Sequence, residues 1–321
     1  MAKKISPKKS PKRILSFSTI LTILVLAIIL FLPGQNIYET SFIKKRPPVA
    51  ETPIVIPTTA PYPVNITGVI PTNLTAQAVL VVDIPSQVAL YQKNPKMRLS
   101  PASITKIMTA LVALETFKME DVLTVKTQIS WGRTMGLITG ERLTFENLLY
   151  GTLVHSANDA AYTLAENYPG GVEKFVQRMN EKARELFLPD TNFANPIGFE
   201  ENGHFTTAAD LARLATNALE NPTIAKIVGI PSITVADANF TRFYQLENVN
   251  ELLGKIPGVL GVKTGWTENA GECLVTAVTK NGRKVLIVVL ASKDRFGETA
   301  SLIDWVFANH RWETIAPPRQ D

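Results

Sequence analysis

Ser100-Pro101-Ala102-Ser103-Ile104-Thr105-Lys106 opens the stretch that decides the fold, and the apolar run 107–114 (Ile-Met-Thr-Ala-Leu-Val-Ala-Leu) follows it directly. Pro101 suits the first turn of a helix and Ser100 is a good cap, so the pattern predicts a buried helix from about 101 to 117. Residues three apart share a helix face, which puts the Ser103 hydroxyl within about 5–6 Å of the Lys106 amine. A lysine whose pKa is lowered by burial can take the proton of a serine, so this pair is a candidate nucleophile and base.

Downstream of this stretch the apolar spacing is first helical and then strand-like. Helical spacing marks three segments between residues 145 and 186 and a fourth at 207–219. Strand-like runs lie at both ends of the sequence, at 76–82, 88–91, 259–264, 272–279 and 284–291, before a closing helix at about 297–309. We therefore expect an α+β fold in which about five antiparallel strands from both ends of the chain form one sheet, covered by helices, with a mostly helical lobe inserted.

The N-terminal third has a different composition. Residues 14–32 are nineteen uncharged, mostly apolar residues preceded by six Lys or Arg residues, which predicts a membrane anchor with a cytoplasmic tail at 1–13. A cleaved signal peptide is the alternative, although no small-x-small cleavage site follows Leu32. Residues 33–75 hold eight of the 21 prolines and predict an extended linker, followed by a folded domain at 76–310 and a tail at 311–321.

Charge and cysteine content exclude several classes of protein. Nine of the 33 Lys and Arg residues but only two of the 28 Asp and Glu residues precede Ala76, so the net charge of +5 resides in the N-terminal part. The remainder carries about −2 and offers no basic face for nucleic acid. Cys273 is the only cysteine, which excludes an intrachain disulfide and fits a core position. No His-Glu-x-x-His or Cys/His pattern predicts a metal site, and we expect no cofactor.

Two further motifs accompany Ser103-x-x-Lys106. Ser156-Ala157-Asn158 lies at the expected start of a helix, and Lys263-Thr264-Gly265 lies at the expected end of a strand. In this order the three motifs resemble those of penicillin-binding proteins and serine β-lactamases, which are Ser-x-x-Lys, Ser-x-Asn and Lys-Thr/Ser-Gly. The resemblance covers about residues 76–305 and is strongest to the D-alanyl-D-alanine carboxypeptidases of low molecular mass. Supporting stretches are 193–198 (Phe-Ala-Asn-Pro-Ile-Gly), 203–212 and 258–265.

The resemblance implies a transpeptidase-like fold and a role for each residue. Ser103 would attack the bond between two D-alanines, Lys106 would take its proton, and Ser156 would relay that proton to the leaving amine. Asn158 would bind the substrate backbone or orient Lys106; Lys263 and Thr264 would hold the terminal carboxylate. Gly265 would let the substrate lie against the strand, and the backbone N–H groups of Ser103 and Trp266 would form an oxyanion hole.

The expected partners are peptidoglycan stem peptides as substrates and β-lactams as covalent inhibitors, with the catalytic domain outside the cytoplasm. Two alternatives remain: a class A-like β-lactamase, and a catalytically silent module that binds wall peptides or β-lactams. The complete set of motifs disfavours the silent module, because mere binding has no need of Lys106. Residues 187–200 contain no Glu four residues before an Asn, the arrangement with which class A β-lactamases activate water, which disfavours the lactamase. His155 is expected to pack and His204 to hydrogen-bond in a turn.

Overall fold

A computed structural model describes residues 16–31 and 60–314 of the chain. The chain divides into two units, Met1–Pro57 and Thr58–Asp321. In the first unit, the described residues form one apolar helix, α1 (Phe17–Phe31), inside the predicted 14–32 segment, whose ends lie outside the described residues. None of the described helices is both long and apolar enough to cross a membrane.

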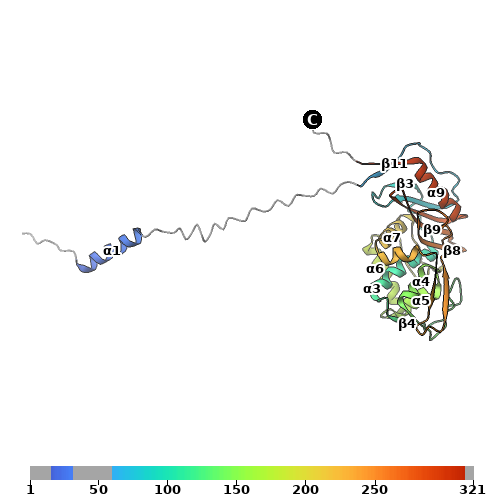
Figure 1. Cartoon of the computed structure of the whole chain (residues 1–321), viewed down its shortest axis with the longest axis horizontal. Coiled ribbons are helices and arrows are strands. Elements are labelled where there is room, and N and C mark those ends of the chain that lie inside the picture. The colour runs from blue at the N-terminus through green and yellow to red at the C-terminus, as the bar shows by residue number, and fades with distance from the viewer. Residues whose placement is uncertain (1–15, 32–59, 315–321) are drawn as a thin grey trace, which may run out of the picture. The chain divides into compact units, whose positions relative to one another are not determined.

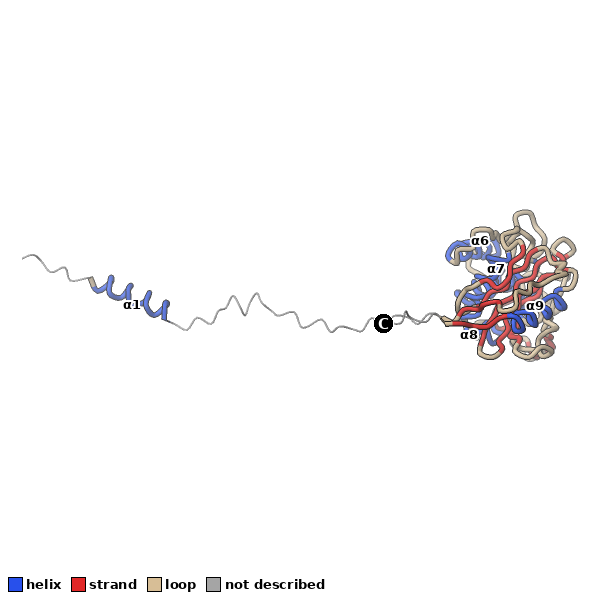
Figure 2. The backbone as a smooth tube through the Cα atoms, turned by 90° about the horizontal axis from the view of Figure 1, so that it is seen from above, coloured by secondary structure: helices blue, strands red, loops and turns tan. Residues whose placement is uncertain are grey.

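The second unit is built around one antiparallel sheet of five strands, as predicted. Its spatial order is β3-β2-β10-β9-β8, so two N-terminal strands lie beside three C-terminal strands and the two groups meet where β2 pairs with β10 (Figure 1). Val288 of β10 pairs with Leu80 of β2 on one side and with Val275 of β9 on the other. Figure 2 shows these strands side by side in one twisted sheet. Their bounds are β2 Ala78–Asp83, β3 Ala89–Lys93, β8 Val259–Thr267, β9 Gly271–Lys280 and β10 Arg283–Ser292.

Helices cover both faces of this sheet because its central strands are apolar on both sides. On one face of the sheet, Leu80, Val275 and Leu286 belong to a core cluster with the helical lobe. On the other face, their neighbours Val81 and Leu274 belong to a second cluster with α9. In Figure 1 the lobe and α9 accordingly lie on opposite sides of the strands. The helices are α3 Lys106–Thr116, α4 Phe145–Leu153, α5 Asn158–Asn167, α6 Gly171–Glu185, α7 Ala208–Glu220, α8 Pro222–Val228 and α9 Arg295–Asn309.

The helix predicted for 101–117 is divided in two. Ala102–Thr105 form a 3₁₀ turn, η1, and the α-helix begins only at Lys106. Ala102 has a φ of 47°, a left-handed conformation that an α-helix does not accommodate. The Ser100 hydroxyl is buried and has no hydrogen-bond partner among the residues that the structure describes, so it is not the predicted cap. As a result Ser103 lies in a tight turn that is packed against β8 rather than in the first turn of a long helix.

The domain boundaries also differ from the prediction. β1 (Tyr62–Asn65) pairs antiparallel with β11 (His310–Glu313), and the Trp312 indole donates to Asp83 of the main sheet at 2.8 Å. Residues 60–75 therefore pack on the domain although they fall in the predicted linker, and 311–313 do so although they fall in the predicted tail. The error arose because prolines suggested an unpaired chain, whereas an edge strand tolerates them.

Two short hairpins and one helix were not predicted. β4 (Val122–Thr124) pairs with β5 (Arg142–Thr144), and β6 (Ser232–Ala236) pairs with β7 (Phe243–Glu247). Helix α8 follows α7 directly, where Asn221 caps its first turn and Pro222 occupies its first position. These elements extend the helical lobe without changing the predicted architecture.

Candidate active site

Lys106 is fully buried, and its amine touches three oxygen atoms. Its Nζ lies 2.8 Å from Ser103 Oγ, 2.8 Å from Asn158 Oδ1 and 2.8 Å from the Ile197 carbonyl oxygen. The amide and carbonyl oxygens can only accept hydrogen bonds, so they take the two hydrogens of a neutral amine. The lone pair of that amine then faces the Ser103 hydroxyl. This arrangement suits a base that removes the serine proton.

The electrostatic surroundings favour the neutral amine. Burial lowers the pKa of Lys106 to about 7, although the nearby Asp159 carboxylate acts in the opposite direction. Burial also lowers the pKa of Lys263, and the positive charges of Lys106, Arg295 and Arg133 lower it further. The neutral form of Lys106 is therefore far more accessible at neutral pH than that of an exposed lysine.

Asn158 begins helix α5 and holds Lys106 in place. Its side-chain oxygen accepts from Lys106, while its side-chain nitrogen donates to the Trp131 carbonyl at 3.1 Å. Its backbone N–H donates to the Arg133 carbonyl at 2.7 Å. Of the two roles foreseen for Asn158, the orientation of Lys106 is the one that these contacts support.

Ser156 is held by the third motif rather than by the first. Its hydroxyl accepts from Lys263 Nζ at 2.7 Å, and Lys263 also donates to the Thr264 carbonyl at 2.9 Å. Among the described residues, Lys106 makes no hydrogen bond to Ser156. The predicted proton relay through Ser156 is therefore not joined to Lys106 by a direct hydrogen bond in this structure.

Lys263, Thr264 and Gly265 lie inside β8, which continues to Thr267, and not at its end as predicted. A Cβ on Gly265 would lie 3.0 Å from the Pro101 carbonyl oxygen and 3.1 Å from Ala102 Cβ. The missing side chain therefore allows β8 to pack closely on η1. Its glycine character brings the strand against the turn that carries Ser103, and the predicted room for substrate beside Gly265 stays a prediction.

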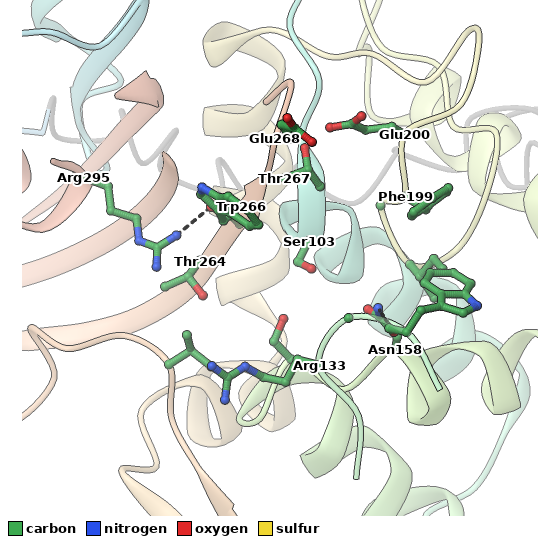
Figure 3. Close-up of a pocket in the computed structure, with 17 residues that line it drawn as sticks. Ser103, Arg133, Asn158, Phe199, Glu200, Thr264, Trp266, Thr267, Glu268 and Arg295 are labelled. Atoms are coloured by element: carbon green, nitrogen blue, oxygen red, sulfur yellow. Dashed lines mark hydrogen bonds between the residues drawn. The ribbon is translucent and has the colours of Figure 1, made fainter. Parts of the chain in front are cut away.

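A cavity of about 750 Å³ joins the three motifs (Figure 3). Ser103 lies near its centre, and Lys106 and Lys263 are buried behind its wall. Six predicted site residues line it directly: Ser103, Ser156, Asn158, Thr264, Gly265 and Trp266. A small, partly apolar cleft with convergent polar groups and perturbed lysines is the expected form of a catalytic site.

Comparisons with known proteins agree with this site. A family model described as D-alanyl-D-alanine carboxypeptidase matches residues 65–294. The D-alanyl-D-alanine carboxypeptidase DacF of Bacillus subtilis is 36% identical over 245 residues, which are 73% of this chain and 63% of that protein. The chain belongs to the D-alanyl-D-alanine carboxypeptidase family.

Further relatives of this family are similar over most of their own length. The D-alanyl-D-alanine endopeptidase of Pseudomonas aeruginosa is 34% identical, with 72% of this chain and 75% of that protein covered. The crystal structure of the Streptomyces K15 DD-transpeptidase matches with a TM-score of 0.71 and 30% identity, over 75% of this chain and all of that one. Penicillin-binding protein D2 of Listeria monocytogenes, in its ampicillin-bound form, matches with a TM-score of 0.67 and 28% identity, over 74% of this chain and all of that one.

Several residues that line this cavity were not predicted from the sequence. Arg295, at the start of α9, donates to the Gly265 carbonyl at 2.8 Å, and the Arg133 guanidinium lies on the other side of Thr264 (Figure 3). Trp131 and Phe199 pack with ring centroids 4.8 Å apart, and the carboxylates of Glu200 and Glu268 lie close together near Thr267 (Figure 3). No local motif marks these positions, because only the folding of distant loops onto β8 brings them together.

The remaining candidate residues from the sequence, Cys273, His155 and His204, do not line the cavity. Cys273 is buried, and burial raises the pKa of its thiol to about 11, in keeping with an inert core position. His155 is half-buried and does not line the cavity. Within residues 16–31 and 60–314, no group of three His, Cys, Asp or Glu side chains could hold a metal ion. His204 is buried and hydrogen-bonded, as expected for the turn before α7.

Proposed function

We propose that this chain is a serine-type D-alanyl-D-alanine carboxypeptidase that removes the terminal D-alanine from peptidoglycan stem peptides through an acyl-enzyme. The observation that carries the proposal is the Lys106 amine, which lies 2.8 Å from Ser103 Oγ while two carbonyl-type oxygens occupy its other directions. The chain spans about 63% of the length of the B. subtilis relative, so the activity is inferred from the site as well as from the family.

In the first step, Ser103 Oγ attacks the carbonyl carbon of the penultimate D-alanine, and its proton passes to Lys106 Nζ. The negative charge on the former carbonyl oxygen is stabilised by the backbone N–H groups of Ser103 and Trp266. The C–N bond then breaks, and the leaving amine takes up the proton that came from Ser103. Water subsequently attacks the ester with Lys106 again as base, which releases the shortened peptide and restores the serine hydroxyl.

The carboxylate of the substrate binds at Lys263 and Thr264, with Arg295 and Arg133 close by. In the empty cavity Lys263 donates to Ser156, but a bound carboxylate is the stronger acceptor and draws this ammonium toward itself. The Ser156 hydroxyl is thereby freed to relay a proton from Lys106 to the leaving amine. Substrate binding thus completes a relay that the free cleft lacks.

The proposal is tested by incubating purified muropeptides with the protein and analysing them by mass spectrometry. Loss of one alanine from pentapeptides indicates carboxypeptidase activity and is the expected result. Splitting of cross-linked dimers would indicate an endopeptidase, and new dimers would indicate a transpeptidase. Unchanged muropeptides in the presence of folded protein would contradict the proposal.

We expect penicillin to act as a slowly released inhibitor. Asp190, which lies in the stretch where class A lactamases carry their water-activating Glu, pairs with Arg98 at 2.7 Å and does not line the cavity. Without a dedicated base, which typically contributes about 10²–10⁴-fold in rate, the penicilloyl ester should persist for minutes or longer. The adduct's lifetime is measured by following release of a fluorescent penicillin after gel filtration. Rapid catalytic hydrolysis of penicillin without peptide cleavage would instead assign a β-lactamase, and absent labelling a silent module.

We also propose that residues 14–32 anchor the protein in the cell membrane, with the N-terminus in the cytoplasm and the catalytic domain outside. Nineteen uncharged residues, most of them apolar, behind six positive charges support this topology. N-terminal sequencing of the membrane-extracted protein should recover a residue before Ile14. A soluble mature protein that starts between Pro33 and Thr75 would show that the segment is a cleaved signal peptide.

A further inference from the structure

His204 is a buried imidazole that the mechanism above does not use. Its side chain is buried, and both ring nitrogens have hydrogen-bond partners. The backbone N–H of Ala194 donates to His204 Nδ1 at 3.0 Å, and His204 Nε2 lies 2.8 Å from Thr105 Oγ1. The ring therefore bridges the 193–198 loop and the turn η1, which are distant in sequence.

These partners determine where the proton of His204 lies. The backbone N–H of Ala194 can only donate, so Nδ1 is unprotonated and Nε2 carries the hydrogen. Nε2–H then donates to Thr105 Oγ1, and the Thr105 hydroxyl in turn donates to the Ala102 carbonyl at 2.8 Å. Burial lowers the pKa of His204 to about 4, so this neutral tautomer is retained at neutral pH.

One end of this chain of hydrogen bonds fixes the nucleophile. Ala102 immediately precedes Ser103 and has a φ of 47°, which is uncommon for an alanine and must be held by its surroundings. Its carbonyl oxygen is held by Thr105 Oγ1 and is closely approached by Gly198, where an added Cβ would lie only 1.9 Å from it. The direction of the Ser103 backbone and side chain depends on this strained residue.

The other end fixes the base. The loop that Ala194 opens contains Ile197, whose carbonyl accepts from Lys106 Nζ at 2.8 Å, and Pro196, whose carbonyl accepts from Thr109 Oγ1. Phe193 packs edge-on against the His204 ring, with centroids 5.9 Å apart. The same imidazole is therefore connected to the loop that orients Lys106 and to the turn that presents Ser103.

We propose that His204 is a positioning residue that couples the nucleophile turn to the loop holding the base, through Thr105 on one side and the Ala194 backbone on the other. This inference rests on the proposed function, since it assigns His204 a role in the acylation of Ser103. The predicted consequence is specific: loss of the link misaligns Ser103 and Lys106 and slows acylation, while the carboxylate-binding end of the cavity stays intact.

The test compares variants of Thr105 and His204 by their rate of acylation with a fluorescent penicillin. Thr105→Val keeps the side-chain shape but cannot accept from His204 or donate to Ala102, whereas Thr105→Ser keeps the hydroxyl. His204→Phe removes both ring hydrogen bonds, and His204→Gln offers one acceptor and one donor in their place. Thr276→Val is the matched control, because Thr276 is equally buried and its hydroxyl has no partner among the described residues.

We expect Thr105→Val and His204→Phe to slow acylation by about 10–100-fold, because misplacement of reacting groups by 1 Å can cost 100-fold. For a D-Ala-D-Ala peptide, kcat should fall while KM stays within about threefold of the wild-type value. We expect this small change in KM because the net contribution of one neutral hydrogen bond is small. Thr105→Ser, His204→Gln and Thr276→Val should recover or retain most of the rate. The double variant Thr105→Val/His204→Phe should be no slower than the slower single variant, since both break the same link.

Circular dichroism and thermal melting establish that each variant is folded, and rates are normalised to the fraction that reacts. Thr105→Val as fast as wild type would overturn the inference, as would strictly additive losses in the double variant. If Thr276→Val lost as much of its acylation rate as Thr105→Val, the effect would come from general damage to the core and the inference would fail. If the folded wild type does not react with penicillin, the proposed function fails. If the wild type reacts and the Thr105 and His204 variants react equally fast, only the inference on His204 fails.

Discussion

Ser103→Ala is expected to abolish both penicillin labelling and D-alanine release, with a loss of at least about 10⁴-fold in kcat/KM. Alanine removes the only atom that forms the acyl bond, and the remaining groups cannot replace it. Ser103 lies in η1, where packing against β8 fixes the backbone independently of its hydroxyl, so the variant should fold normally. The measurement is the extent of fluorescent penicillin labelling, together with alanine release from a D-Ala-D-Ala peptide.

Ser100→Ala provides the matched control for this variant. Ser100 precedes the same turn, its hydroxyl has no hydrogen-bond partner within residues 16–31 and 60–314, and it does not line the cavity. It should therefore react at nearly the wild-type rate. Labelling that survives in Ser103→Ala, or that is lost equally in Ser100→Ala, would remove Ser103 from its assigned role.

Lys106→Met is expected to slow acylation by about 10²–10⁴-fold, the usual contribution of a general base. Methionine is of similar length and apolar, so it suits the fully buried position, but it has no lone pair able to take the Ser103 proton. The acylation rate with a labelled penicillin measures the effect. Lys126→Met, at an exposed lysine outside the cavity, should react like wild type, and a wild-type rate in Lys106→Met would show that another group is the base.

The pH dependence of the wild type follows from the same residue. The pKa of Lys106 is lowered from its ordinary value to about 7, and only the neutral amine accepts a proton. The acylation rate should therefore fall as pH decreases through about 7 and level off above it. In Lys106→Met this limb of the profile should disappear.

Much of the fold could be predicted because its signals are local. The hairpin β9–β10 follows from the Asn-Gly turn at 281–282, and α7 follows from its apolar spacing. The division of the first helix could not be predicted in this way. The left-handed Ala102 is imposed by Thr105, Gly198 and the approach of β8, all of them tertiary contacts that no propensity of alanine indicates.

In the candidate site, too, the residues within local motifs could be predicted and the contacts made by tertiary folding could not. Ser103, Lys106, Ser156, Asn158, Lys263 and Thr264 could be found because short motifs carry them, and they all belong to one cavity and its wall. The partners of individual atoms could not be predicted, such as Lys263 rather than Lys106 at Ser156. Arg295, Arg133 and the Ile197 carbonyl were missed because their roles depend on where loops lie and not on which residues they contain.

The most direct test of the account is to locate the covalent bond. The folded protein is incubated with penicillin, digested and mapped by tandem mass spectrometry. The account predicts one penicilloyl group per chain, on the peptide that contains Ser103 and on that hydroxyl alone. A penicilloyl group on Ser156 or any other residue, or none at all in protein shown to be folded, would contradict it.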